Sequence, residues 1–212
     1  MIEKYNGKHF VIAIGRQCGS GGKEIAALLS QRLDIKTYDR NLLTEISKES
    51  GFAEEVLEMN DENPTNSLIY SIAMNPYAMS TITNFSLPLN NKLFLAQFDT
   101  IKKIAEKESC IFVGRCADYV LEGMDNLITV FITADDEDRK KTIMETDQVA
   151  EEKVANYIRN IDKKRAGYYN YYTDKKWGNA RNYDLCINRS KVGVEGSVDL
   201  ILEFLDKMLA NK

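Results

Sequence analysis

The sequence predicts an α/β fold in which a parallel sheet is covered by helices on both faces. Short apolar runs of β type alternate with longer stretches of helical periodicity, which is the pattern of parallel strands joined by helical crossovers. The first apolar run leads into a glycine cluster and a lysine that opens a helical pattern. With 212 residues, 44% of them hydrophobic, the chain can form one large core, so we expect a single domain over residues 1–212.

Four elements are expected at the start of the chain. The apolar run Phe10–Ile14 predicts a strand at His9–Gly15, and the glycines that follow open a helix at Gly22–Leu33. A short strand at Lys36–Tyr38 and a helix at Arg40–Ser50 come next. This order of strand, helix, strand and helix is how a parallel sheet begins.

The second half of the chain repeats the alternation. Its strands are the short apolar runs, and its helices are the longer stretches between them. In chain order the expected elements are a helix at Lys92–Lys107, strands at Cys110–Gly114 and Ile128–Thr133, helices at Asp136–Thr146 and Glu151–Tyr172, a strand at Asp184–Asn188 and a helix at Val194–Leu209.

Residues 60–91 interrupt this alternation. The segment contains all three prolines (Pro64, Pro76 and Pro88) together with many polar and several apolar residues. We expect an inserted subdomain here. Its apolar residues could close over a substrate, form the interface of a homodimer or pack a small core of their own, and the sequence leaves these alternatives open.

The glycine cluster has the composition of a phosphate-binding loop. Four glycines leave backbone N–H groups unshielded by side chains: Gly15, Gly19, Gly21 and Gly22. The helix behind them directs its free amides and its positive dipole end at an anion. Lys23 would then reach the β- and γ-phosphates of a nucleotide. The alternative is a glycine-rich turn that binds no ligand.

Two positions depart from a Walker A loop. Counting back from Lys23, Gln17 stands where a glycine is expected. Glu24 stands where a serine or threonine would bind Mg²⁺. Magnesium would therefore be held by Ser20, Glu24 or water, since bound Mg²⁺ keeps several waters. The residues expected to contact the nucleotide are Gly19, Ser20, Gly21, Gly22, Lys23 and Glu24.

The same glycines also fit a dinucleotide-binding turn. The spacing of Gly15, Gly19 and Gly21 resembles the loop of short-chain dehydrogenases. Tyr171 and Lys175 resemble the catalytic pair of those enzymes. This oxidoreductase alternative is disfavoured, because such folds need further strands after the pair and only one strand-like run remains. A lysine directly after the glycines also has no role in a dinucleotide turn.

Polar side chains follow the strand expected at Cys110–Gly114. Ligands of open α/β sheets bind at the carboxyl ends of strands, and Arg115 offers a fixed guanidinium fork for a phosphate there. Asp118 could accept a hydrogen bond from a base amino group or a sugar hydroxyl of a substrate. The alternative is a surface ion pair between the two residues.

The longest expected helix carries a cluster of cations. Arg159 and Lys163 lie one turn apart on one face, as do Asp162 and Arg165. We expect residues 148–178 to form a lid whose cations, Arg159 and Arg165 among them, stabilise charge on a transferring phosphate. A solvated basic face on an acidic protein is the alternative.

The bulk composition narrows the function classes. A formal charge of −4 and a pI near 5.3 argue against nucleic acid as the main partner. No signal peptide or membrane-length apolar run occurs, so we expect a cytoplasmic protein that does not bind membranes. The single histidine, His9, disfavours chemistry that needs a histidine base, whereas phosphoryl transfer needs none.

A resemblance to a known family rests on five segments: Ile14–Ala26, Tyr38–Arg40, Gly114–Asp118, Ile132–Asp135 and Asp162–Ala166. Over nearly its whole length the chain resembles the cytidylate kinase-like proteins of the nucleoside monophosphate kinase superfamily. The resemblance implies the three-layer fold of P-loop kinases, with a five-stranded parallel sheet, an acceptor-binding subdomain formed by the insertion and a helical lid. It also implies ATP and Mg²⁺, and a small-molecule acceptor.

The resemblance further implies roles for individual residues. Lys23 and the glycine amides would bind the phosphates of ATP, whereas Arg40 and Arg115 would bind the phosphate of the acceptor. Asp162 and Arg165 would belong to the lid and to the nucleotide end of the site. The reaction expected on this basis is transfer of the γ-phosphoryl group of ATP to CMP or dCMP.

Three departures from true cytidylate kinases leave the acceptor open. Cys116 stands where those enzymes have a carboxylate directly after the strand-end arginine. Ile158 stands where they have an arginine, and Glu24-Ile25 replaces a glycine and threonine after the loop lysine. Two further alternatives therefore stay open: a kinase of another small metabolite, or a nucleotide-binding sensor that keeps the fold without turnover.

Overall fold

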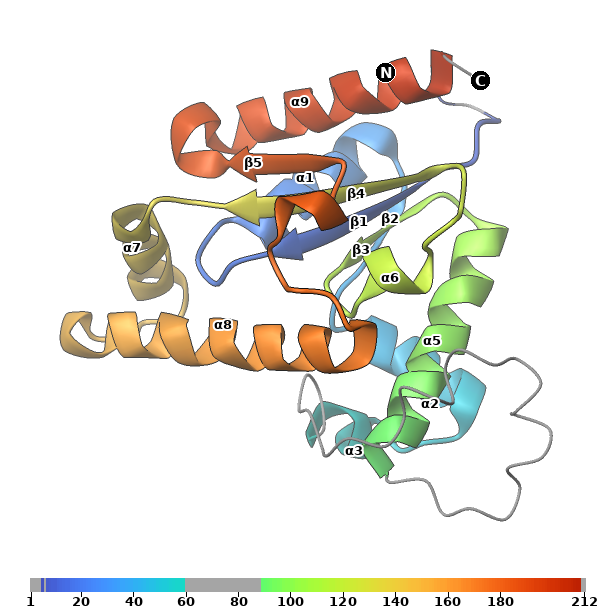
Figure 1. Ribbon diagram of the computed structural model, residues 1–212, viewed down its shortest axis with the longest axis horizontal. Helices are drawn as coiled ribbons and strands as arrows, with labels where there is room; N and C mark the ends of the chain where they lie inside the picture. Colours follow the sequence, from blue (N-terminus) through green and yellow to red (C-terminus); the bar gives the residue numbers. More distant parts are fainter. Residues whose placement is uncertain (1–4, 6, 60–88, 211–212) are drawn as a thin grey trace.

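A five-stranded parallel sheet lies at the centre of the part of the chain that the structure describes (Figure 1). The computed structural model describes residues 5, 7–59 and 89–210. The strands are β1 (Val11–Arg16), β2 (Lys36–Tyr38), β3 (Cys110–Val113), β4 (Leu127–Thr133) and β5 (Leu185–Asn188). Their order in the sheet is β2-β3-β1-β4-β5, and every neighbouring pair is parallel. The predicted fold class is confirmed.

Helices cover both faces of the sheet. Those in the described residues are α1 (Gly22–Leu33), α2 (Leu42–Ser50), α3 (Glu54–Met59), α5 (Leu89–Lys107), α6 (Ala117–Val120), α7 (Asp136–Thr146), α8 (Glu151–Thr173) and α9 (Arg189–Ala210). In β1, Ile12 and Ile14 pack with α1 and α9, whereas Val11 and Ala13 pack with α2, α5 and α6. Both faces are buried, which explains why the strands are continuous apolar runs in the sequence.

The long helix α8 is anchored near both of its ends. Near its start, Val154 and Ile158 pack against α7 and against the loop that follows β1. Near its end, Tyr172 stacks on Phe94 of α5 with ring centroids 4.0 Å apart, and Tyr168 joins the same cluster. Figure 1 shows α8 running from α7 toward α5. The helix therefore lies firmly against the carboxyl edge of the sheet.

Several boundaries differ from the expected ones. The helices α3 and α6 have six and four residues and were not expected, because they are too short for a helical repeat to show in the sequence. The last helix begins at Arg189 rather than Val194 and is interrupted at Gly193, where φ is 71°. The insertion expected at 60–91 lies outside the described residues except for 89–91, which begin α5.

No helix of the described residues has both the length and the apolar character needed to cross a membrane.

A pair of neighbouring residues on α9 tests how this helix packs. Ile201 is fully buried against the sheet, whereas Leu200 is 43% exposed. Ile201→Ala should lower the free energy of unfolding by about 2–5 kcal/mol, because it removes buried carbon atoms and leaves a cavity. Leu200→Ala should change it by less than about 0.5 kcal/mol. Urea denaturation followed by circular dichroism measures both, and equal losses would contradict the packing of α9.

Candidate functional site

The glycine-rich loop connects β1 to α1 at the carboxyl edge of the sheet. Its backbone is held in a tight turn: Gln17 N donates to the Ile132 carbonyl at 3.0 Å, and Ser20 N donates to the Gln17 carbonyl at 3.3 Å. The N-cap residue of α1 is Gly21, and no side chain caps the helix. The first-turn amides of α1 are therefore suited to bind an anion.

A pocket of about 310 Å³, called here the loop pocket, opens over this turn. All six loop residues expected to contact a nucleotide, from Gly19 to Glu24, line it. Arg40, Thr142 of α7 and Arg165 of α8 also line it. The volume falls at the lower end of the range of small-molecule sites, about 300–1,000 Å³.

A carboxylate lies beside the loop lysine. Asp39 directly follows β2, and its Oδ2 is 3.1 Å from Lys23 Nζ. Its Oδ1 is 3.8 Å from a guanidinium nitrogen of Arg16. The Lys23 side chain is 59% exposed, so this ion pair is weak and Lys23 can exchange Asp39 for a phosphate.

The side chain of Arg16 is buried between two glycines. A Cβ atom at Gly22 would lie 2.6 Å from Cβ of Arg16, and a Cβ atom at Gly114 would overlap the Arg16 guanidinium. Gly114 also has a φ of 77°, a conformation that residues with side chains rarely adopt. This packing joins the start of α1 to the end of β3.

Both backbone groups of Cys18, near the middle of the loop, are hydrogen-bonded by other elements. Cys18 N donates to Asp162 Oδ1 of α8 at 2.8 Å, and Arg139 Nε of α7 donates to the Cys18 carbonyl at 2.8 Å. Arg139 and Asp162 also form an ion pair with each other, and Arg139 contacts Asp136 at 3.3 Å. We call the Arg139–Asp162 pair the Cys18 clamp. Burial raises the pKa of the Cys18 thiol to about 11, which favours the thiol over the more nucleophilic thiolate.

The two expected lid arginines lie on different faces of α8. Arg165 lines the loop pocket, and its guanidinium donates to the Arg16 carbonyl at 3.3 Å. Arg159 is exposed, donates to the Asn156 side chain at 2.8 Å and lines a second pocket. Six positions along a helix of 3.6 residues per turn separate their faces. The structure therefore brings only Arg165 to the loop.

The chain after β3 is buried rather than exposed. Arg115 is 4% exposed and, like Cys116, has a left-handed backbone. The carbonyl of Arg115 accepts from Gln97 Nε2 at 3.0 Å. Asp118 accepts from the Tyr169 hydroxyl at 2.6 Å, which ties α6 to α8. A surface ion pair between Arg115 and Asp118 is thus the wrong description, because Arg115 is not at the surface.

The expected site residues separate into two groups. Those around the loop pocket are Gly19, Ser20, Gly21, Gly22, Lys23, Glu24, Arg40 and Arg165. Those outside it are Arg115, Asp118, Arg159 and Asp162, of which Asp162 supports the loop from behind through Cys18. The binding and catalytic roles of both groups stay predictions.

The side chains considered for Mg²⁺ differ in their surroundings. The Ser20 hydroxyl donates to the Gln17 carbonyl at 2.8 Å, and the residue is fully buried. Glu24 is exposed and lines the loop pocket, and Asp39 adds a second carboxylate beside Lys23. Carboxylate oxygens fit Mg²⁺, which takes one or two of them together with water and substrate phosphates.

Sequence reasoning did not single out three charged residues at the loop. Asp39 and Arg189 directly follow strands, which is a signal that could have identified them. Arg189 reaches the Gly19 carbonyl at 3.4 Å and the Thr142 hydroxyl at 3.1 Å. Arg139 stands in a run of charged residues that is typical of a solvated helix, so its sequence gives no such signal.

The buried Asp118 carboxyl leads to a pH-dependent prediction. Burial raises its pKa above the usual range, so the carboxyl keeps its proton to a higher pH in the folded protein than in the unfolded chain. Its contribution to the free energy of unfolding is greatest below the unfolded pKa of about 3.9 and is lost as pH rises through the folded pKa. Asp118→Asn still accepts from Tyr169 but does not ionise. Its stability relative to the parent should increase from about pH 3 to about pH 7 in urea denaturation. A constant difference would contradict the raised pKa.

Known structures share this fold over almost the whole chain. An uncharacterized protein from Eubacterium ventriosum ATCC 27560 is 32% identical, with a TM-score of 0.71 over 93% of this chain and 99% of that chain. The shikimate kinase of Bacteroides thetaiotaomicron is 15% identical, with a TM-score of 0.52 over 93% and 98%. The shikimate kinase of Acinetobacter baumannii, solved with shikimate, is 12% identical, with a TM-score of 0.52 over 100% and 99%.

The sequence itself matches one family profile. No protein of curated function matches it significantly. The profile described as "Cytidylate kinase-like family" matches residues 11–191, from the first strand to the start of α9. The chain therefore has the fold of the P-loop kinases and belongs to the cytidylate kinase-like family.

Proposed function

We propose that the protein transfers the γ-phosphoryl group of ATP to a small acceptor, with CMP or dCMP as the first candidate. The observation that carries this proposal is the composition of the loop pocket. Lys23 stands there beside the uncapped first turn of α1, and Arg40 and Arg165 line the same pocket from other elements. Phosphoryl transfer needs this combination of backbone donors and cations, because its catalysis is mainly positioning and charge stabilisation.

Each group around the loop pocket has a role in this reaction. The loop amides bind phosphate oxygens, and Lys23 leaves Asp39 to bind the β- and γ-phosphates. Arg165 reaches the pocket from α8 and stabilises the charge of the transferring group. Mg²⁺, held by the phosphates, water and a carboxylate of Glu24 or Asp39, would neutralise phosphate charge.

Family membership supports a nucleoside monophosphate as the acceptor, and Arg40 is the cation at the pocket that would bind its phosphate. At two positions the chain lacks the charged groups of true cytidylate kinases. Cys116 and Ile158 replace a carboxylate and an arginine of true cytidylate kinases, and both are buried in apolar clusters. Ile158 has no polar side-chain atom and a thiol forms only weak hydrogen bonds, so neither replaces the charged group by which those enzymes would hold a substrate.

Asp39 favours a second candidate, a small metabolite with a hydroxyl acceptor. An attacking hydroxyl needs a carboxylate to orient it and take its proton, whereas a phosphate acceptor needs none. Asp39 lies 3.1 Å from Lys23, the residue proposed to bind the β- and γ-phosphates. Two structural neighbours of the same fold are shikimate kinases, which shows that this fold accommodates an acceptor other than a nucleotide.

A coupled ADP-release screen over nucleoside monophosphates and small alcohols tests the proposal. The parent should release ADP with at least one acceptor, and Lys23→Ala should release it at least about tenfold more slowly, because one charge-assisted contact to the phosphates is lost. Lys207→Ala, which removes an exposed lysine at the far end of α9, is the matched control. ATP binding without ADP release for any acceptor would contradict the kinase proposal and indicate a nucleotide sensor.

Once the screen has identified an acceptor, the role of Arg165 in turnover can be tested. Arg165→Ala should lower kcat by about 10²-fold or more, since a preorganised charge-stabilising group is lost, and should change KM for ATP far less. Lys164→Ala removes the neighbouring exposed cation of α8, which lines neither pocket, and should keep the parental kcat. If the two variants turn over equally, Arg165 is part of a solvated basic face and not of the site.

A further inference from the structure

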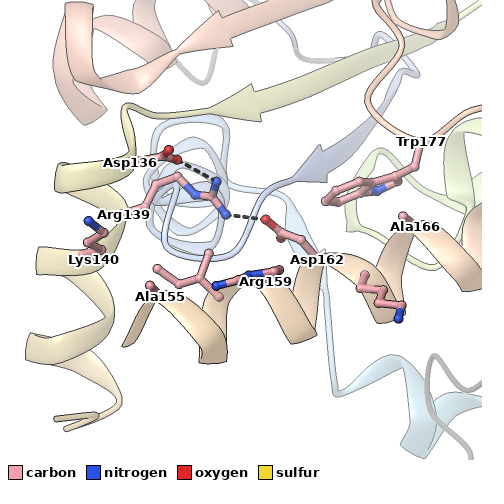
Figure 2. A pocket seen from close by; sticks show the side chains of 10 residues that line it. Asp136, Arg139, Lys140, Ala155, Arg159, Asp162, Ala166 and Trp177 are labelled. Atoms are coloured by element: carbon pink, nitrogen blue, oxygen red, sulfur yellow. Dashed lines mark hydrogen bonds and ion pairs between the residues drawn. The ribbon is translucent and has the colours of Figure 1, made fainter. Parts of the chain in front are cut away.

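A second and larger pocket, of about 720 Å³, lies between α7, α8 and the loop that carries Trp177 (Figure 2). It shares no lining residue with the loop pocket. The Cys18 clamp separates the two: Arg139 and Asp162 line this pocket, and Cys18, to which both are hydrogen-bonded, lines the other. We call it the α7–α8 pocket. Its occupant would therefore be a ligand additional to the donor nucleotide in the loop pocket.

The α7–α8 pocket carries positive charge that its own carboxylates do not neutralise. Asp136 and Asp162 both pair with the buried Arg139, as Figure 2 shows. Arg159 and Lys163 also line the pocket, and within residues 5, 7–59 and 89–210 no carboxylate forms an ion pair with either. The whole chain has a formal charge of −4, so this local surplus is a feature of the pocket and not of the surface in general.

The rest of the pocket is apolar and holds an aromatic ring. Ala155, Ile158 and Ala166 form a strip along α8. Figure 2 shows the indole of Trp177 across the pocket from the Arg139–Asp162 pair. A bare phosphate would leave this surface unused, whereas a planar ring joined to phosphate would cover it. The volume lies within the range of sites for ligands of that size, about 300–1,000 Å³.

We propose that the α7–α8 pocket binds a nucleoside phosphate as a second, non-reacting ligand, with its base against Trp177 and its phosphates on Arg159 and Lys163. Arginine and lysine supply the charge-assisted hydrogen bonds that phosphates require. An indole face stacks on any nucleobase, at a gain of about 1–3 kcal/mol per base. The proposal is independent of which acceptor the loop pocket serves.

Trp177 is the single tryptophan of the chain, so its fluorescence reports directly on this pocket. The probe is ATP in the presence of EDTA, and the starting protein is Lys23→Ala, which weakens competing binding at the loop. Two further proteins are made in the Lys23→Ala background. The pocket variant adds Arg159→Gln and Lys163→Gln, and the control adds Lys153→Gln and Lys164→Gln. The control residues are exposed on α8 and line neither pocket, so both sets remove the same charge from the same helix.

In both the Lys23→Ala protein and the control, ATP should change the fluorescence of Trp177 saturably. The apparent Kd values of these two proteins should be similar. In the pocket variant the apparent Kd should rise about tenfold or more, since two charged contacts to phosphate are lost. Far-UV circular dichroism checks that all proteins are folded. Sodium tripolyphosphate should bind the Lys23→Ala protein more weakly than ATP, because it lacks a base to stack on Trp177.

The proposal is overturned if Lys23→Ala gives no saturable response, or if the pocket variant and the control have the same Kd. Tripolyphosphate binding as tightly as ATP would overturn the assignment to a nucleoside phosphate. A response in the parent that Lys23→Ala abolishes would mean that Trp177 senses the loop pocket, and this also contradicts a second site. None of these outcomes depends on ADP release, so failure here and failure of the kinase proposal are distinguishable.

Discussion

The Cys18 clamp is the constraint on which the rest of the candidate site depends, because it joins the glycine-rich loop to α7 and α8 at a single residue. Asp162 holds the Cys18 amide and Arg139 holds its carbonyl, so the curvature of the loop and the rotation of α8 are fixed together. The rotation that turns Asp162 to the loop also brings Arg165 into the loop pocket and Arg159 into the α7–α8 pocket. Removing either Arg139 or Asp162 alone is expected to destabilise the clamp, since the remaining partner of the buried ion pair would carry an uncompensated charge.

A loop held in this way is shaped before any ligand arrives, and preformed dipoles are what stabilise charge in a transition state without reorganisation. The adjustment on binding is then expected in exposed side chains such as Lys23, whose weak ion pair with Asp39 would give way to the proposed phosphate ligand. A large swing of α8 would instead break buried contacts near both of its ends, including the stacking of Tyr172 on Phe94. The helix α8 is therefore a fixed part of the candidate site, because a large movement of it would cost these buried contacts.

The sheet was predictable because its strands are buried on both faces and read as apolar runs between helical stretches. The loop was predictable because glycines leave backbone N–H groups unshielded and the lysine after them adds a positive charge, a combination suited to an anion. The Cys18 clamp was not predictable from the sequence. Arg139 stands among many charged residues in its helix, and only the folded structure shows that it is buried. The burial of Arg115 was equally hidden, because it depends on a left-handed turn at two residues that are not glycine. Contacts between residues far apart in the sequence depend on how the elements pack, and the sequence around each residue does not indicate them.

The burial of Arg16 between Gly22 and Gly114 has a consequence for which substitutions this chain can accept. The arginine fills space that the two glycines leave open, so any side chain acquired at position 114 displaces it. Loss of the arginine would in turn leave a void beside the loop that neither glycine can fill. A substitution at any one of these three positions is therefore expected to require compensating changes at the other two.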